Sequence, residues 1–136
     1  MIEQRVMGID FGEKRIGIAL SDPLLIFAYA HLTFENDNNI WKKLKNLIES
    51  KKVVKVILGL PNKDKNPELT EKVFLFKGEL EKRFSLKVIT WDERFTSLMA
   101  QARIIESVPK KKNRRDKGLI DRNSAAIILE EYLNSL

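Results

Sequence analysis

The chain of 136 residues carries 25 Lys and Arg against 19 Asp and Glu, a formal charge of +6, with no cysteine and one histidine. This composition excludes disulfides, cysteine nucleophiles, thiolate zinc sites and multi-histidine metal clusters. No apolar run reaches the roughly 20 residues that cross a bilayer, and the N-terminus does not resemble a signal segment. We therefore expect a single cytoplasmic domain over residues 1–136, without a membrane, whose basic balance suits a polyanionic partner.

Hydrophobic periodicity predicts three consecutive strands, then helix, strand, helix, strand and two helices. The first two strands flank a tight turn at Gly12, a residue that tolerates positive φ, and Gly59 and Pro61 are expected to end the fourth strand. His31 falls in the third strand and is expected at the sheet edge. The predicted strands are Val6–Ile9, Ile16–Leu20, Phe27–Phe34, Val53–Leu58 and Leu86–Trp91, and the predicted helices are Ile40–Glu49, Glu68–Phe84, Thr96–Ser107 and Leu119–Leu136. Hairpin-linked strands followed by alternating helices and strands predict an α/β fold, a mixed five-stranded sheet flanked by helices.

Acidic residues occur where these elements end or begin. Asp10 ends the first strand, Asp92 and Glu93 follow the last strand, and Asp121 opens the final helix. Strand ends on one edge of an open α/β sheet face a common crevice, so these carboxylates are expected to converge. Converging carboxylates repel each other unless a cation neutralises them, and oxygen ligands without His or Cys favour Mg²⁺ or Mn²⁺. Two such ions about 4 Å apart can activate water and stabilise the leaving oxygen of a phosphodiester.

Each of these acids also has a purely structural interpretation. Asp10 is an ordinary residue for a turn, and Asp121 is a good N-cap for its helix. Asp92 and Glu93 can form a weak surface ion pair with Arg94. A small shift of the turn would also let Asp92, rather than Glu93, take a ligand position.

The excess positive charge is concentrated just before the final helix. Residues 110–117 (KKKNRRDK) contain six basic residues and one acid. Such a density favours salt-sensitive, sequence-independent contact with a phosphate backbone over a merely solvated loop. The candidate nucleic-acid-binding residues of this segment are Lys110, Lys111, Lys112, Arg114, Arg115 and Lys117. Trp41 and Trp91 are expected to pack in the core or at its edge rather than to stack on bases.

Four segments together resemble the YqgF, or RuvX-type, proteins. They are GIDFGEKRIGIALSD at 8–22, GLP at 59–61, DERFTS at 92–97 and IDRNSAAIILEEYL at 120–133. These proteins are small bacterial relatives of the Holliday-junction resolvase RuvC and have an RNase H-like fold. Lys65 and Asn66 follow Asp64 where the family often has a glycine, and Ser97 replaces a usual threonine, which puts the loop shape in doubt and leaves the acids in place.

The resemblance implies a divalent-metal nuclease that acts in maturation of the 5′ end of precursor 16S ribosomal RNA. Matched by position, Asp10, Glu93 and Asp121 are the catalytic and metal-binding residues, with Mg²⁺ or Mn²⁺ as cofactor. Arg15 and Arg94 match basic positions near the acids and can meet phosphates. The implied partner is nucleic acid, structured RNA or branched DNA, bound by a monomer or a weak homodimer.

Other functions fit parts of the sequence. The same acids would serve a Holliday junction-resolving DNA endonuclease acting as a dimer. The Asp-x-Gly hairpin also occurs in ATP-binding domains of the actin and Hsp70 type, but that architecture needs two lobes and 136 residues suffice for one. A non-catalytic nucleic-acid-binding module would use the basic segment alone, and its binding would survive chelation of metal and loss of Asp10.

Overall fold

A computed structural model gives the structure of the chain and describes residues 3–93, 96–107 and 117–136. Part of the predicted nucleic-acid-binding set lies outside the described residues, and for Lys117 the description covers the backbone alone. The predicted residues outside are Arg94, Lys110, Lys111, Lys112, Arg114 and Arg115. In the described part of the chain, no helix is long and apolar enough to cross a membrane.

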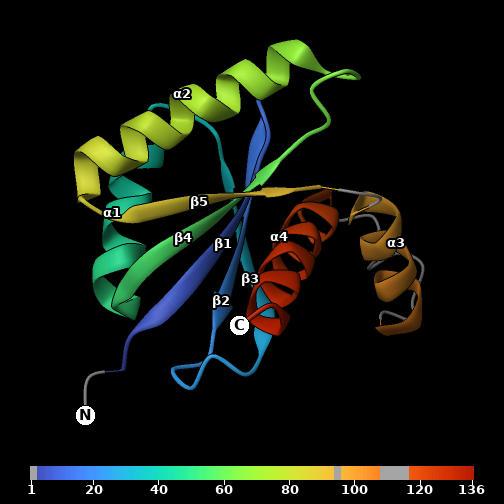
Figure 1. Cartoon of the computed structure of the whole chain (residues 1–136), viewed down its shortest axis with the longest axis horizontal. Coiled ribbons are helices and arrows are strands. Elements are labelled where there is room, and N and C mark those ends of the chain that lie inside the picture. Colours follow the sequence, from blue (N-terminus) through green and yellow to red (C-terminus); the bar gives the residue numbers. More distant parts are fainter. Residues whose placement is uncertain (1–2, 94–95, 108–116) are drawn as a thin grey trace.

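A five-stranded sheet in the order β3-β2-β1-β4-β5 forms the centre of the molecule (Figure 1). The strands are β1 (Arg5–Phe11), β2 (Arg15–Ser21), β3 (Ala28–Glu35), β4 (Val53–Leu60) and β5 (Lys87–Asp92), and the helices are α1 (Ile40–Lys51), α2 (Pro67–Phe84), α3 (Thr96–Ser107) and α4 (Lys117–Asn134). β1 pairs antiparallel with β2 and parallel with β4. The predicted element order and the mixed sheet are therefore confirmed, and His31 lies on the edge strand β3 as expected.

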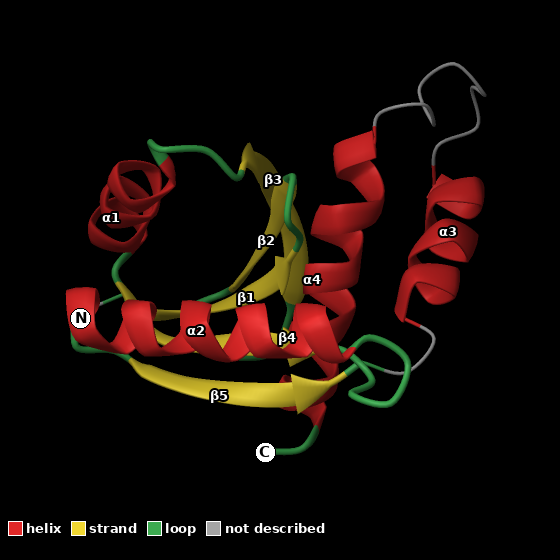
Figure 2. Cartoon of the chain, turned by 90° about the horizontal axis from the view of Figure 1, so that it is seen from above, coloured by secondary structure: helices red, strands yellow, loops and turns green. Residues whose placement is uncertain are grey.

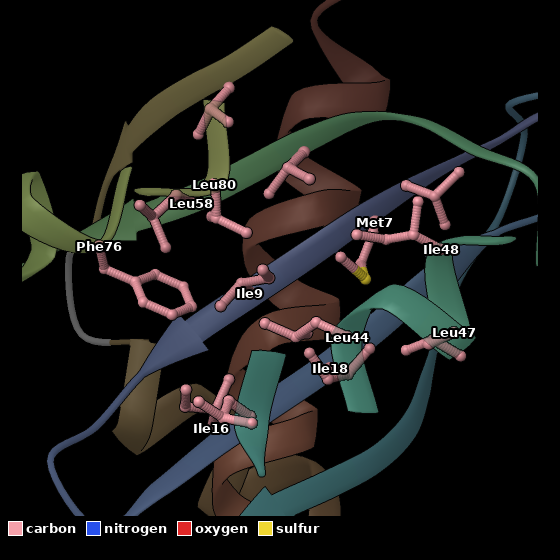
Figure 3. Packing of buried hydrophobic residues seen from close by; sticks show 14 of the residues in the cluster. Met7, Ile9, Ile16, Ile18, Leu44, Leu47, Ile48, Leu58, Phe76 and Leu80 are labelled. Carbon is pink, nitrogen blue, oxygen red and sulfur yellow. The ribbon is translucent and has the colours of Figure 1, made fainter. Parts of the chain in front are cut away.

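Helices cover both faces of the sheet. Helices α1 and α2 lie on one face, and α4 lies on the other with α3 packed outside it (Figure 2). Side chains of the strands alternate between the two faces. The core on the first face is shown in Figure 3 and includes Met7, Ile9, Ile16, Ile18, Leu44, Leu47, Ile48, Leu58, Phe76 and Leu80. The core under α4 includes Val6, Ala19, Ile57, Ala125, Ile128, Leu129 and Tyr132. Asp10 lies four residues after Val6 in β1, and every second side chain of a strand points to the same face of the sheet, so the side chain of Asp10 points to the α4 face.

Two glycines let α4 lie directly on the strands. A Cβ on Gly8 would stand 2.7 Å from the carbonyl oxygen of Ala125, and a Cβ on Gly17 would overlap the carbonyl group of Asp121. Only a residue without a side chain permits such a close approach of helix backbone to sheet. Since Gly17 pairs with Asp10 across β1 and β2, this contact places the first turns of α4 beside Asp10.

One prediction about a glycine was wrong. Gly59 does not end β4, because the strand runs on to Leu60 and Gly59 pairs with Trp91 of β5. The turn between β1 and β2 uses no positive φ at Gly12. A Cβ on Gly12 would instead stand 2.5 Å from the carbonyl oxygen of Arg15, so the turn needs a glycine for space rather than for backbone conformation.

The predicted start of the final helix was also wrong. Helix α4 begins at Lys117, so Asp121 lies in its second turn and does not serve as its N-cap. The two tryptophans pack as predicted. Trp41 stacks on Phe76, with ring centroids 5.1 Å apart, and Trp91 makes an edge contact with Tyr132.

Candidate carboxylate site

Asp10 lies near the carboxyl end of β1, in the interior of the sheet. Its neighbours across the sheet are Gly17 of β2 on one side and strand β4 on the other. A strand that is paired on both sides has its backbone hydrogen bonds satisfied within the sheet, so the backbone that carries Asp10 is held in place. Asp10 is thus a rigidly held carboxylate facing the start of α4.

Glu93 directly follows β5 and continues its course. Its N–H donates to the carbonyl oxygen of Leu60 at 2.9 Å. A Cβ on Gly59 would stand 2.7 Å from Oε1 of Glu93, so this carboxylate lies over the bare backbone of β4. Alternation turns the neighbouring Asp92 away, and Asp92 is exposed. The structure therefore brings Glu93, and not Asp92, to the side of Asp10.

Asp121 reaches the site from α4 and is paired with Arg15 of β2. Nε of Arg15 donates to Oδ2 of Asp121 at 2.7 Å, and 32% of the Arg15 side chain and 19% of the Asp121 side chain are exposed. The start of α4 is tied to β3 as well, since Oγ1 of Thr33 donates to the carbonyl oxygen of Gly118 at 2.6 Å. The charge-assisted hydrogen bond between Arg15 and Asp121 fixes the orientation of both side chains.

The electrostatics of Asp10 show that these carboxylates have converged. Burial raises the pKa of Asp10 well above its ordinary range. The negative charge of Glu93, a hydrogen bond with the Glu93 side chain and the charge of Asp121 raise this pKa further. Carboxylates that are buried close together repel each other when both are ionised and no counter-charge lies between them.

The chemistry of this donor set suits a hard divalent cation. All the donors are carboxylate oxygens, and a cation bound among them would offset the burial and the neighbouring negative charges that raise the pKa of Asp10. Within residues 3–93, 96–107 and 117–136, no group of three acidic or histidine side chains is close enough as placed to hold one ion. The carboxylate of Asp121 is instead paired with Arg15.

A pocket of about 220 Å³ adjoins the site beside Glu93. Its lining comes from the segment that follows β4 and from the end of β5: Leu60, Pro61, Asn62, Lys63, Asp92 and Glu93. Lys63 places a basic side chain at this pocket and was not among the candidate residues named from the sequence. Its position two residues after the GLP motif was the one available signal.

The sequence is similar to a known family and to proteins of two bacteria. The profile of the RuvX family, described as Holliday junction resolvase, matches residues 4–135. A protein of Azobacteroides pseudotrichonymphae is 42% identical over 97% of both chains. One of Bacteroides thetaiotaomicron is 40% identical over 96% of both chains. Both are named "Putative pre-16S rRNA nuclease".

The structure is similar to two solved resolvases. It matches RuvC of T. thermophilus in complex with a Holliday junction substrate, with a TM-score of 0.61 and 16% identity over 97% of this chain and 94% of that chain. It also matches the fowlpox virus Holliday junction resolvase, with a TM-score of 0.59 and 15% identity over 97% of this chain and 99% of that chain. Identities this low show the fold alone, and they confirm the predicted RNase H-like fold.

Proposed function

We propose that this chain, which belongs to the RuvX family, is a divalent-metal-dependent nuclease that hydrolyses phosphodiester bonds at the 5′ end of precursor 16S ribosomal RNA. The names of its relatives support the reaction class and the RNA substrate. The single observation that carries the proposal is the hydrogen-bonded carboxyl pair of Asp10 and Glu93 with the charge of Asp121 beside it. Such a cluster destabilises a fold unless it serves to bind a cation.

Asp10, Glu93 and Asp121 would hold Mg²⁺ or Mn²⁺ in this proposal. A divalent cation bound there supplies positive charge for the phosphoryl transition state and lowers the pKa of a coordinated water. The chain contributes the positions of the donors. Asp10 is fixed by the central strand, Glu93 is accommodated by Gly59, and Asp121 is carried by a helix docked on Gly17.

Basic side chains near these acids would bind the substrate. Arg15, whose guanidinium already lies against Asp121, can turn to a phosphate when Asp121 takes up a cation. Lys63 adds a positive charge at the pocket beside Glu93. We propose that Arg94 and the basic segment 110–117, including Lys117, contact the phosphate backbone next to the cleaved bond. These contacts would make binding salt-dependent and independent of sequence.

Cleavage of a transcribed precursor 16S rRNA leader in Mg²⁺ tests this proposal. Wild-type protein is expected to cut the leader, chelation is expected to stop it, and Asp10→Asn is expected to lower the rate by at least about 100-fold, since a lost ligand removes several kcal/mol of stabilisation. Asp92→Asn is the matched control and is expected to cut normally. An Asp10→Asn protein as active as wild type would contradict the mechanism, and RNA binding without Mg²⁺-dependent cleavage would favour a non-catalytic binding module.

A DNA endonuclease that resolves Holliday junctions is the second candidate. The description of the matched family favours it. Its chemistry would use the same acids, but it requires a dimer that presents two sites to paired strands. A synthetic four-way DNA junction, incubated under the conditions used for the RNA leader, distinguishes the two. Symmetric paired incisions in the junction support this candidate, and an intact junction beside a cleaved leader contradicts it.

A further inference from the structure

Ser124 lies in the interior of α4 and carries a buried hydroxyl group. The residue is 1% exposed, and its Oγ has no hydrogen-bond partner within the described residues. A buried hydroxyl group without a partner destabilises a fold, because it gives up its hydrogen bonds to water and gains none in the protein. In a native protein such an atom is typical of a place that a water, an ion or a ligand contacts.

Other hydroxyl groups on the helices bond to the backbone of their own helix. Oγ of Ser50 donates to the carbonyl oxygen of Leu47 at 3.3 Å. Oγ1 of Thr70 donates to the carbonyl oxygen of Asn66 at 2.9 Å. Such bonds to a preceding carbonyl are the usual way in which a helix satisfies serine and threonine. Ser124 forms no such bond within the described helix, so its hydroxyl group remains available to a ligand.

The direction of α4 locates this hydroxyl group relative to the strands. The carbonyl group of Asp121 lies over Gly17, which pairs with Asp10 near the carboxyl end of β1. The carbonyl oxygen of Ala125 lies over Gly8, which is two residues earlier in the same strand. Helix α4 therefore runs antiparallel to β1, and also to β5, because β1, β4 and β5 are parallel to one another. The first turns of α4 thus lie at the carboxyl ends of these strands.

Ser124 lies on the side of α4 that borders Glu93. Later in the helix, the Glu131 carboxylate accepts a hydrogen bond from Nε1 of Trp91 at 3.2 Å. Ser124 precedes Glu131 by seven residues, about two turns, and so lies on the same side of the helix. Glu93 follows Trp91 by two residues and so points to the same face of the sheet. Ile128, one turn after Ser124, lies with Glu93 against one glycine of β4.

We propose that the Ser124 hydroxyl group is a neutral oxygen ligand of the cation that Asp10, Glu93 and Asp121 would hold. This inference rests on the proposed cation site and adds a donor to it. Hard divalent cations accept neutral oxygens beside carboxylates, and serine hydroxyl groups bind Mg²⁺ in other proteins. Ser124 lies three residues after Asp121, a spacing that places two side chains on one face of a helix. The cation supplies the partner that this hydroxyl group lacks within the described fold.

Isothermal titration with Mn²⁺ compares wild type with Ser124→Ala. The alanine is expected to weaken Mn²⁺ binding by about tenfold or more, because one donor is lost. Ser50→Ala is the matched control, since Ser50 belongs to α1 on the other face of the sheet, and it is expected to bind like wild type. If Ser124→Ala binds normally while Asp10→Asn binds weakly, the role of Ser124 is overturned and the cation site stands. A wild type that binds no Mn²⁺ overturns both.

Thermal unfolding of metal-free protein separates a ligand from a hydroxyl group that stabilises the fold. Ser124→Ala is expected to keep or raise the melting temperature, because the hydroxyl group makes no hydrogen bond within the described residues and alanine favours a helix. The same substitution should therefore leave the metal-free fold intact and weaken cation binding. A fall of about 5 °C or more in melting temperature would show that the hydroxyl group stabilises the fold itself, and it would overturn the proposal.

Exchange of the donor atom tests direct contact between this side chain and the ion. The chain has no cysteine, so Ser124→Cys introduces a unique thiol. A thiolate prefers soft cations, so the affinity for Cd²⁺ relative to Mn²⁺ is expected to exceed that of wild type by about tenfold or more. Bound Cd²⁺ should also give the ultraviolet absorption of a Cd²⁺–thiolate bond. Adding Asp10→Asn should weaken this Cd²⁺ binding, because the thiolate and the carboxylate hold one ion. An unchanged affinity ratio, or Cd²⁺ binding that is insensitive to Asp10→Asn, contradicts the proposal.

Discussion

Replacing Gly17 with alanine tests whether α4 rests directly on the sheet beside Asp10. The new methyl group would overlap the carbonyl group of Asp121, which is helix backbone and not the flexible end of a side chain. Either β2 bends or the first turns of α4 move outward. Outward movement also strains the hydrogen bond from Thr33 to the carbonyl oxygen of Gly118.

The expected loss of stability follows from these contacts. Overpacking costs about 1–3 kcal/mol, and an obstacle made of backbone lies at the upper end of that range. A weakened hydrogen bond adds about 1 kcal/mol. Lower entropy of the unfolded chain with alanine offsets about 0.5–1 kcal/mol. The net loss is about 3 kcal/mol, which corresponds to a fall of about 10 °C in melting temperature for a chain of this size.

Urea unfolding of dilute protein, followed by circular dichroism, measures this change. The control is Gly78→Ala, whose methyl group meets nothing within 4 Å and which is expected to gain about 1 kcal/mol. The two glycine-to-alanine changes should thus move stability in opposite directions. A Gly17→Ala protein that is as stable as wild type would refute the docking of α4 on β2 at Asp121.

Two further substitutions test the carboxylates and the space around them. In metal-free buffer, the raised pKa of Asp10 means that its carboxyl group binds a proton more tightly in the folded chain than in the unfolded chain. The free energy of unfolding should therefore fall as the pH rises from the ordinary aspartate range through the raised pKa. Urea unfolding at a series of pH values should show that Asp10→Asn removes this fall, and equal pH slopes in the two proteins would contradict the assigned environment. Gly59→Ala should change stability by less than about 1 kcal/mol, because its Cβ meets only the ends of the Ile128 and Glu93 side chains, at 2.5 and 2.7 Å. The same variant should cut the RNA leader on the order of 100-fold more slowly, because Glu93 is displaced, and a normal rate would show that the position of Glu93 is not critical.

Most of the strands and helices could be predicted because their buried apolar residues recur at the spacing typical of a helix or a strand. In α1, the residues Ile40, Leu44, Leu47 and Ile48 are buried with lysines between them, which is the periodicity of a helix on a sheet. Helix α4 differs, since it lies between the sheet and α3 and is buried continuously from Ser124 to Leu129. The sequence predicted this helix but could not locate its first residue, because no polar face marks where the buried stretch begins, and Asp121 was placed too close to the start of the helix for this reason.

The candidate acids could be predicted, but their environment could not. Alternation along β5 places Glu93 on the same side as Trp91, yet sequence alone does not say which side faces α4. Gly17 and Gly59 are needed because a side chain at either position would collide with atoms of α4 or of the residue that follows β5. Such contacts between distant segments arise from tertiary packing, so the sequence alone does not reveal that Gly17 leaves room for α4 and Gly59 leaves room for Glu93.

Binding of Mn²⁺, measured by isothermal titration, tests most directly whether these carboxylates form one cation site. Wild type is expected to bind Mn²⁺, and Asp10→Asn and Glu93→Gln are each expected to weaken binding by more than about 100-fold, since each removes a ligand. Asp92→Asn, which changes the exposed neighbour of Glu93, is expected to bind like wild type. A Glu93→Gln protein that binds Mn²⁺ normally, together with an Asp92→Asn protein that does not, would contradict the site.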